Sequence, residues 1–282
     1  MCGIAGYIGD QEISKRSIQE TLKIMDHRGP DAQGFKQVRG PHQNGLLLHT
    51  RLAIVDLDRR SSQPFVDQEN ILVFNGEIYN FIEIRRSLIA LGHTFKTSGD
   101  TEVLAVALRQ WGKGALNRLE GMWAFIWYQG CTKTFLVSRD RFGEKPLFMT
   151  EGNNGVYFAS EVKALITFSN ETPELNHSHM FRYLVNGYKS IHKTNDNFFQ
   201  NVSEVEPGSC IEFQYNRRPI YTRYWNRLIA EDPSLTRDDA ILRVREAFLE
   251  SMKLRLRSDV PLAFCLSGGG LKQYNCDRSQ SF

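Results

Sequence analysis

Six short apolar runs limit the folds open to this chain. They occupy residues 3–8, 46–49, 71–74, 122–127, 134–137 and 156–159. Several are continuously apolar, which is typical of strands buried on both faces. Between the runs, spaced apolar residues predict amphipathic helices at 14–25, at 80–92 and at 100–111. The sequence therefore predicts a mixed domain of strands and helices that extends from Cys2 to about Tyr215.

Composition excludes several classes of function. The 282 residues suffice for one large domain, or for one domain and part of a second. A net charge of +3 with scattered basic residues gives no case for nucleic-acid binding, and no apolar run is long enough to cross a membrane. The five cysteines form no CxxC pair and the seven histidines are dispersed. We therefore expect no metal site and a reducing, cytoplasmic location.

Cys2 is a candidate nucleophile because of its position. A small residue after Met1 normally allows removal of the initiator methionine, which would leave Cys2 at the mature N-terminus. That one residue would then carry a thiol with a pKa near ~8.5 and an α-amine with a pKa near ~8, so the amine can serve as the base. The alternative interpretation is an inert, partly buried thiol.

Dense polar clusters lie between the predicted strands, where a core would not place them. They are 27–31 (HRGPD), 51–54 (RLAI), 75–80 (NGEIYN), 98–102 (SGDTE) and 139–147 (RDRFGEKPL). Together with Cys2-Gly3-Ile4, this set resembles the glutaminase domain of the glutamine-hydrolysing asparagine synthetases, over roughly residues 2–225. Sugar-phosphate and purine amidotransferases share the N-terminal Cys-Gly-Ile, and the other clusters favour the asparagine synthetase branch.

The resemblance implies a fold and a reaction. The fold is α+β, the four-layer α/β/β/α sandwich of the N-terminal-nucleophile (Ntn) hydrolases, over a glutaminase domain at residues 2–215. The reaction is hydrolysis of L-glutamine to glutamate and ammonia through a thioester on Cys2. The family pattern implies that the Asn75 side-chain amide and the Gly76 backbone N–H stabilise the oxyanion. The glutaminase reaction is expected to need no cofactor.

The same resemblance implies how glutamine is held. Arg51 would bind the α-carboxylate with its planar guanidinium, and Glu77 and Asp100 would face the α-ammonium. Arg51 could instead be a surface arginine, and Asp100 could merely cap a helix. His27 and His49 could suggest a papain-like Cys–His pair, but the family uses the α-amine as the base, so we expect both histidines to be structural. We expect residues 139–145 to form a structural loop.

Residues 216–282 are expected to form a linker and the truncated start of an α/β PP-loop ATPase domain. A helix is predicted at 237–257, with Thr236 and Asp239 as a capping box. A buried strand at 260–266 would then lead into an incomplete ATP-binding loop at Leu266, Ser267, Gly268 and Gly269. The family expects x-Asp-Ser next, whereas this chain has Gly270-Leu271-Lys272. The apolar faces of the helix and the strand should be exposed.

The complete family protein would use ATP and Mg²⁺ to convert aspartate to asparagine with the ammonia. Several alternatives stay open for this chain. It could be an inactive remnant of a frameshifted gene, or a stand-alone subunit that supplies ammonia to a separate synthetase domain for amidation of another carboxylate. A homodimer is also possible. The ammonia acceptor is chosen by the synthetase part, so these residues do not identify it.

Overall fold

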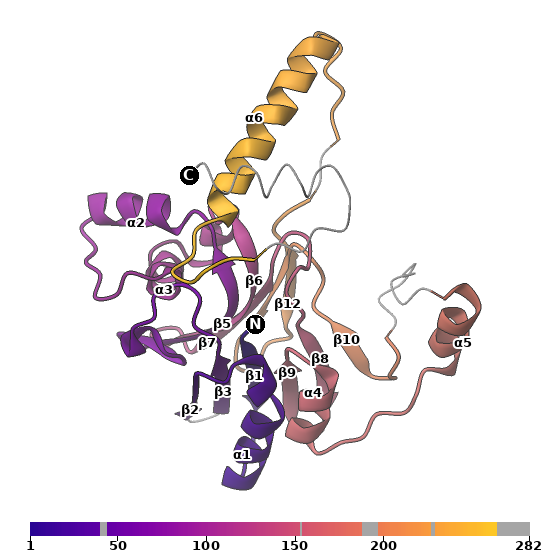
Figure 1. Cartoon of the computed structure of the whole chain (residues 1–282). Coiled ribbons are helices and arrows are strands. Elements are labelled where there is room, and N and C mark those ends of the chain that lie inside the picture. Colours follow the sequence, from indigo (N-terminus) through magenta and orange to yellow (C-terminus); the bar gives the residue numbers. More distant parts are fainter. Residues whose placement is uncertain (40–43, 153, 188–196, 227–228, 264–282) are drawn as a thin grey trace. The chain divides into compact units, whose positions relative to one another are not determined.

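The computed structural model describes residues 1–39, 44–152, 154–187, 197–226 and 229–263 (Figure 1). Two compact units are present. The first comprises Met1–Ala53 and Asp58–Asn226, and the second comprises Ile54–Leu57 and Arg227–Phe282. The first unit continues beyond the boundary predicted at residue 215, because strand β12 (Ile220–Arg223) pairs with β11 (Ser209–Phe213).

The first unit is built on two antiparallel sheets of six strands each. Sheet A has the strand order β10-β8-β9-β1-β3-β2, and sheet B has the order β12-β11-β7-β6-β5-β4. The remaining strands of sheet A are β1 (Gly3–Gly9), β2 (Ala32–Arg39), β3 (Asn44–Arg51), β8 (Phe148–Gly152), β9 (Gly155–Ala159) and β10 (Val202–Glu204). Those of sheet B are β4 (Phe65–Asp67), β5 (Asn70–Ile78), β6 (Gly121–Gln129) and β7 (Thr134–Arg139).

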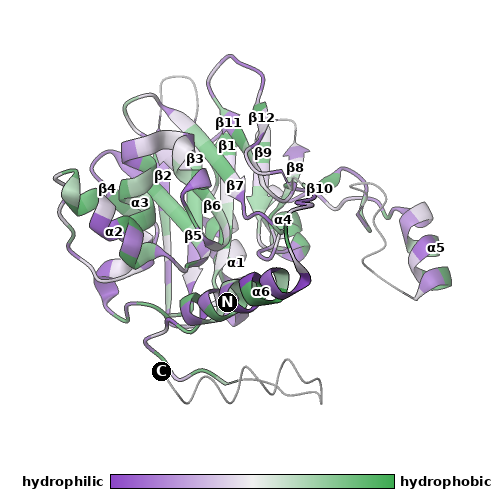
Figure 2. Cartoon of the chain, turned by 90° about the horizontal axis from the view of Figure 1, so that it is seen from above, coloured by the Kyte–Doolittle hydropathy of each residue, from purple (hydrophilic) through white to green (hydrophobic). Residues whose placement is uncertain are grey.

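Helices cover the outer face of each sheet and complete four layers (Figure 1). Helices α1 (Lys15–Ile24) and α4 (Val162–Ser169) pack together on sheet A, while α2 (Phe81–Ala90) and α3 (Asp100–Trp111) pack on sheet B. Three clusters of buried apolar residues fill the spaces: one between the sheets, and one under each helix pair. The hydrophobic colouring of the central strands reflects this double-sided burial (Figure 2). The predicted four-layer α/β/β/α fold is confirmed.

All six apolar runs are strands, and the three predicted helices of this unit form as α1, α2 and α3. The sequence missed β2, β4, β8, β10, β11 and β12, together with α4 and α5 (His177–Asn186). One expectation about the polar clusters is wrong. Asn75, Gly76 and Glu77 were placed between strands, yet they lie inside β5, and Arg51 is the last residue of β3. The backbone ladder of β5 with β6 continues through these residues whatever their side chains.

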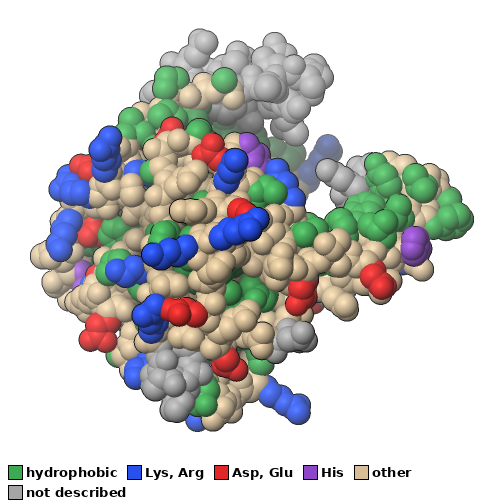
Figure 3. All heavy atoms as spheres, turned by 90° about the horizontal axis from the view of Figure 1, so that it is seen from below, with side chains coloured by type: hydrophobic (Ala, Val, Ile, Leu, Met, Phe, Trp, Pro, Cys, Tyr) green, Lys and Arg blue, Asp and Glu red, His purple; other side chains and the backbone are tan. Residues whose placement is uncertain are grey.

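The surface of the first unit mixes positive and negative side chains, and apolar side chains gather on α5 (Figure 3). On that helix Phe181, Leu184 and Val185 are exposed. No helix in the described part of the chain is long and apolar enough to span a membrane.

The second unit is dominated by α6 (Arg237–Arg255), whose Thr236 side chain caps the Asp239 N–H as predicted. Ile241 and Val244 are exposed on this helix, Val244 by 69%. The predicted strand at 260–266 is wrong over its described part: residues 260–263 form no strand, and 261–263 are exposed. An apolar run becomes a strand only where a neighbouring strand completes its hydrogen bonds. Residues 264–269, including the expected ATP-binding loop at Leu266, Ser267, Gly268 and Gly269, lie outside the described residues.

Candidate active site

Cys2 lies directly before β1, which pairs with β3 from Gly3 opposite Thr50. The half-buried Cys2 Sγ accepts a hydrogen bond from the Leu52 N–H at 3.4 Å and lies 3.5 Å from the Leu52 carbonyl oxygen. Burial raises the pKa of the Cys2 thiol, although the Leu52 N–H and the Arg51 cation counteract this effect. A thiol with a raised pKa is a weak nucleophile at neutral pH, so it requires a base.

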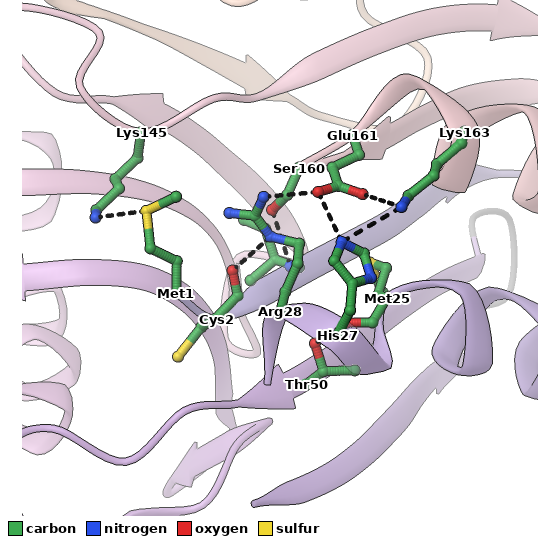
Figure 4. Close-up of polar contacts among 11 residues, drawn as sticks. Met1, Cys2, Met25, His27, Arg28, Thr50, Lys145, Ser160, Glu161 and Lys163 are labelled. Atoms are coloured by element: carbon green, nitrogen blue, oxygen red, sulfur yellow. Dashed lines mark hydrogen bonds and ion pairs between the residues drawn. The ribbon is translucent and has the colours of Figure 1, made fainter. Parts of the chain in front are cut away.

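Arg28 fixes the backbone of Cys2 (Figure 4). It ends a short 3₁₀ helix, Asp26–Arg28, and its Nε donates a 2.9 Å hydrogen bond to the Cys2 carbonyl oxygen. Its other side forms a 2.9 Å ion pair with Glu161, which His27 and Lys163 also contact. Partial burial opposes ionisation of Glu161, but these three hydrogen bonds hold its pKa below the usual value. The nucleophile is therefore anchored at both its carbonyl and its sulfur.

Arg51 is buried, so the alternative of a surface arginine is wrong. One terminal nitrogen of its guanidinium donates to the Asp58 carbonyl oxygen at 2.9 Å and to the Ser62 hydroxyl at 3.3 Å. These bonds fix the plane of the cation close to Cys2, where it favours the thiolate electrostatically. Asp31 orders the same strand end, because its N–H donates to the Arg51 carbonyl oxygen at 2.9 Å.

His49 joins the two sheets next to this site. Its Nε2 lies 3.2 Å from the Phe74 carbonyl oxygen, and its Nδ1 has no hydrogen-bond partner among the described residues. Complete burial lowers the pKa of His49 to about 3, so the ring is neutral and a poor general base near pH 7. Because Phe74 immediately precedes Asn75, this contact brings the end of β3 close to the polar part of β5.

Asn75 presents a buried donor without a hydrogen-bond partner among the described residues. Its side chain is 1% exposed, and its Nδ2 has no hydrogen-bond partner in the described structure. A buried polar group left unpaired costs roughly 1–3 kcal/mol, so such groups are rare unless a ligand completes them. The Asn75 amide is thus suited to an acceptor that arrives with a substrate.

The free edge of β5 shows where the Gly76 N–H points. The Phe74 N–H on this edge donates to Gln63 Oε1 at 2.6 Å, and the Ile78 N–H donates to Asp100 Oδ2 at 2.9 Å. Backbone groups two residues apart on a strand face the same edge. The Gly76 N–H therefore lies on this edge, between two N–H groups that side chains already satisfy.

The opposite strand confirms this direction. Trp123 pairs with Gly76, but its N–H donates to the Asp140 carboxylate at 3.2 Å and its carbonyl oxygen accepts from the Asp140 N–H at 2.8 Å. Both backbone groups of Trp123 therefore point away from Gly76. Glycine is needed here for packing, because a Cβ at this position would lie 2.0 Å from the Met122 carbonyl oxygen.

Asp100 and Glu77 are two acidic groups with weakened acidity. Asp100 is the first residue of α3, and Gly99 is the N-cap, so the simple capping alternative for Asp100 is wrong. Burial raises the pKa of Asp100 to about 7, against the Ile78 N–H bond, and the charge of Glu77 adds to the rise. Burial likewise raises the pKa of Glu77, while the Lys145 cation counteracts it. An incoming cation would stabilise both carboxylates.

The structure thus gathers the predicted residues at one end of the sandwich. Cys2, Arg51 and Asp100 interact electrostatically, and Asn75, Gly76 and Glu77 are consecutive on β5. Sequence reasoning missed the bond from Arg28 to the Cys2 carbonyl and the position of Lys145 beside Met1. Neither has a local signal, because both depend on residues distant in the sequence. Within the described ranges no cluster of three or more His, Cys, Asp or Glu side chains could hold a metal.

This chain has a four-layer α/β/β/α sandwich with a cysteine held directly before its first strand. That is the arrangement of the N-terminal-nucleophile class of folds. Among solved structures, the chain is similar to glutamine phosphoribosylpyrophosphate amidotransferase from B. subtilis, complexed with ADP and GMP. The TM-score is 0.59 at 22% identity, over 80% of this chain and 50% of that one. A likeness at this identity concerns the fold.

The family follows from the sequence comparison. Residues 1–225 match the glutamine amidotransferase domain, and the chain belongs to that family. Over 95% of its length it is 34% identical to asparagine synthetase [glutamine-hydrolyzing] 1 of Bacillus subtilis (strain 168). Over the same share it is 31% identical to amidase chry2 of Gibberella zeae and 29% identical to putative asparagine synthetase [glutamine-hydrolyzing] 2 of Methanocaldococcus jannaschii. It spans 42%, 41% and 55% of these relatives, respectively. The predicted resemblance is confirmed.

Proposed function

We propose that this domain hydrolyses L-glutamine to glutamate and ammonia, with Cys2 as the nucleophile. One observation carries the proposal: the buried Asn75 amide, which has no partner among the described residues, stands beside the Gly76 N–H on the free edge of β5, a strand that contacts β1. Two donors fixed in advance are what a tetrahedral oxyanion requires, and loss of one typically costs about 3 kcal/mol. An inactive remnant would not be expected to retain this costly unsatisfied donor.

The reaction begins after removal of Met1. The Cys2 α-amine accepts the thiol proton while Sγ forms a bond to the side-chain carbonyl carbon of glutamine. The oxyanion that results accepts hydrogen bonds from the Asn75 Nδ2 and the Gly76 N–H. The α-amine then gives the proton to the amide nitrogen as the C–N bond breaks, which releases ammonia and leaves a thioester. Water attacks the thioester by the reverse sequence and releases glutamate.

The substrate's amino-acid end is held by charges. Arg51, fixed by its bonds to Asp58 and Ser62, would bind the α-carboxylate. The α-ammonium would be bound by Asp100 and Glu77, because burial raises the pKa of both carboxyl groups and a nearby cation would counteract that effect. Binding of glutamine would therefore drive both groups to the ionised form.

The ammonia would supply an ATP-dependent amidation. The names of the bacterial and archaeal relatives favour aspartate as the acceptor and asparagine as the product, with ATP and Mg²⁺ as cofactors of a synthetase part. This part would be either covalently continuous or a separate partner domain. None of the glutaminase steps above requires ATP or Mg²⁺. A cytoplasmic location suits the free thiols of Cys2, Cys131 and Cys210.

The test is glutamate release from glutamine by the full chain, after mass spectrometry has verified loss of Met1. We expect release by the wild-type protein and none by Cys2→Ala, whose fold should be unchanged because Cys2 precedes β1 and is half-buried. Trapping of a glutamyl adduct on the N-terminal peptide would identify the thioester. A folded, processed wild-type sample that releases no glutamate would contradict the proposal.

A further inference from the structure

A buried carboxylate organises the loop that carries Lys145. Asp140 is completely buried at the end of β7, and its side-chain oxygens accept four backbone hydrogen bonds. The donors are the N–H groups of Trp123 (3.2 Å), Phe142 (2.9 Å), Glu144 (3.0 Å) and Lys145 (3.0 Å). A carboxylate that accepts several backbone hydrogen bonds orders a turn strongly. The loop is therefore rigid although it belongs to no helix or strand.

A second buried side chain holds the carbonyl groups of the same loop. Arg139 Nε donates to the Lys145 carbonyl oxygen at 2.8 Å, and a terminal nitrogen donates to the Gly143 carbonyl oxygen at 2.9 Å. The guanidinium also forms a 2.7 Å ion pair with Glu204. Both backbone groups of Lys145 are thus fixed by buried charged side chains, so the fold determines where the lysine points.

The Lys145 side chain points to the N-terminus of the chain (Figure 4). It is 6% exposed, and its Nζ lies 3.3 Å from the Met1 sulfur. A thioether is a weak acceptor, and a buried ammonium normally has a strong one. Within the described part of the chain, Lys145 therefore has a poor hydrogen-bond partner, and that partner belongs to the residue that processing would remove.

Charged groups surround this lysine and the N-terminus. Burial lowers the pKa of Lys145, and Arg28 adds to this effect, while Glu77, Cys2 and Glu144 counteract it.

Burial also lowers the pKa of the Met1 α-amine. Around that amine, the cations Arg28 and Lys145 act in the same direction as burial, whereas Cys2 and Asp31 oppose it. Arg51 and Asp100 act on the thiol with opposite signs.

We propose that Lys145 is a positioning residue of the processed enzyme, whose ammonium faces the new Cys2 α-amine and keeps that amine in its neutral, basic form. Removal of Met1 takes away the thioether and moves the chain's α-amine to Cys2. Cys2 itself stays in place, because Arg28 holds its carbonyl and Leu52 holds its sulfur. A fixed cation beside an amine disfavours its protonation and, beside a thiol, favours the thiolate.

This inference rests on the proposed function but can be tested apart from it. The test compares wild type, Lys145→Met and Lys145→Arg as full chains with verified loss of Met1. Lys113→Met serves as a control, because Lys113 is a half-exposed lysine that pairs with Glu212 and is not among the charged groups that act on Lys145 or the N-terminus. The first readout is the pH profile of kcat/KM for glutamine. The second is the pH dependence of iodoacetamide alkylation of Cys2, followed on the N-terminal peptide.

In Lys145→Met we expect the acidic limb of both profiles to move up by about one pH unit, with roughly tenfold slower alkylation at pH 7. Lys145→Arg should restore the wild-type profiles, and Lys113→Met should leave them unchanged. Should Lys145→Met not fold, Glu77→Gln should shift the alkylation profile in the opposite direction, since it removes an anion that compensates Lys145. Unchanged alkylation profiles in the folded Lys145 or Glu77 variants would overturn the inference. Absence of glutamine hydrolysis in wild type would instead overturn the proposed function.

Discussion

The two sheets contribute to the candidate site in different ways. Sheet A supplies Cys2 and Arg51, and both are tied to the surrounding chain through Leu52, Asp58 and Ser62. Sheet B supplies the Asn75 amide, which has no hydrogen-bond partner in the described structure, and its neighbour α3 supplies Asp100, whose pKa burial raises to about 7. Cys2 and Arg51 are hydrogen-bonded before substrate arrives. Among the described residues, the Asn75 Nδ2 has no partner, and Asp100 has the Ile78 N–H as a donor, so a cation for Asp100 would come from substrate. The residues from sheet A are thus positioned in advance, while Asn75 and Asp100 can still gain a hydrogen bond or an ion pair from a ligand.

The sharpest test of this difference is Asn75→Leu. We expect kcat for glutamine hydrolysis to fall by about 10²–10³, because one of the two oxyanion donors is lost. Stability should be unchanged or higher, because the substitution removes a buried donor that no described residue satisfies. Steady-state kinetics and urea unfolding of the same preparation measure both quantities. A clear loss of stability would show that the Asn75 amide has a structural partner after all.

Arg51→Met should behave differently, because the sheet A side is already bonded. We expect kcat/KM to fall by about 10–100-fold through a raised KM, since the cation for the α-carboxylate is lost. We also expect a loss of about 1–2 kcal/mol in the free energy of unfolding, because the Asp58 carbonyl and the Ser62 hydroxyl lose their donor. Arg59→Met is a suitable control, as this arginine is exposed in the neighbouring turn. Equal stability of Arg51→Met and wild type would remove the distinction between the sheets.

Apolar patterning predicted six of the eight interior strands, missing β8 and β11, and none of the four edge strands. The six predicted strands are β1, β3, β5, β6, β7 and β9. Each of them has a neighbouring strand on both sides in its sheet. All four edge strands, β2, β4, β10 and β12, were missed. Edge strands expose their side chains, as Ile220 and Tyr221 of β12 do, so burial imposes no apolar pattern on them. The error at 260–263 is the converse, an apolar run without a neighbouring strand.

The candidate site likewise contains features that the sequence predicts and features that it does not. Cys2, Arg51, Asn75, Gly76 and Asp100 could be identified because they stand in short motifs that resemble a family. The contacts that prepare them could not, because each joins distant segments: Leu52 with Cys2, and Arg28 with the Cys2 carbonyl. The packing role of Gly76 against Met122 was equally hidden, since it depends on the register of β5 with β6. Short motifs indicate which side chains form the candidate site. Contacts between distant segments determine how those side chains are held and whether they are protonated in the free protein.

The last prediction concerns the protonation of Asp100. Burial raises the pKa of Asp100 from 3.8 to about 7, so the folded protein binds this proton more tightly than the unfolded chain does. The stability that follows is fully present below about pH 4 and is lost as pH rises through about 7. Asp100→Asn keeps an acceptor for the Ile78 N–H and removes the charge. Its stability relative to wild type should therefore grow with pH, to about 4 kcal/mol at pH 8.

Urea unfolding of both proteins between pH 4 and pH 8 measures this difference, and effects of other groups cancel in it. Asp58→Asn provides a control of opposite sign, because a hydrogen bond from Arg60 lowers the pKa of Asp58 to about 2. Loss of that carboxylate should cost stability throughout the range, with no gain at high pH. A difference between Asp100→Asn and wild type that does not vary with pH would mean that Asp100 is ionised in the free protein. The Asp100 carboxylate would then already be stabilised within the chain, without a cation from substrate. The difference between the two sheets would not hold for Asp100.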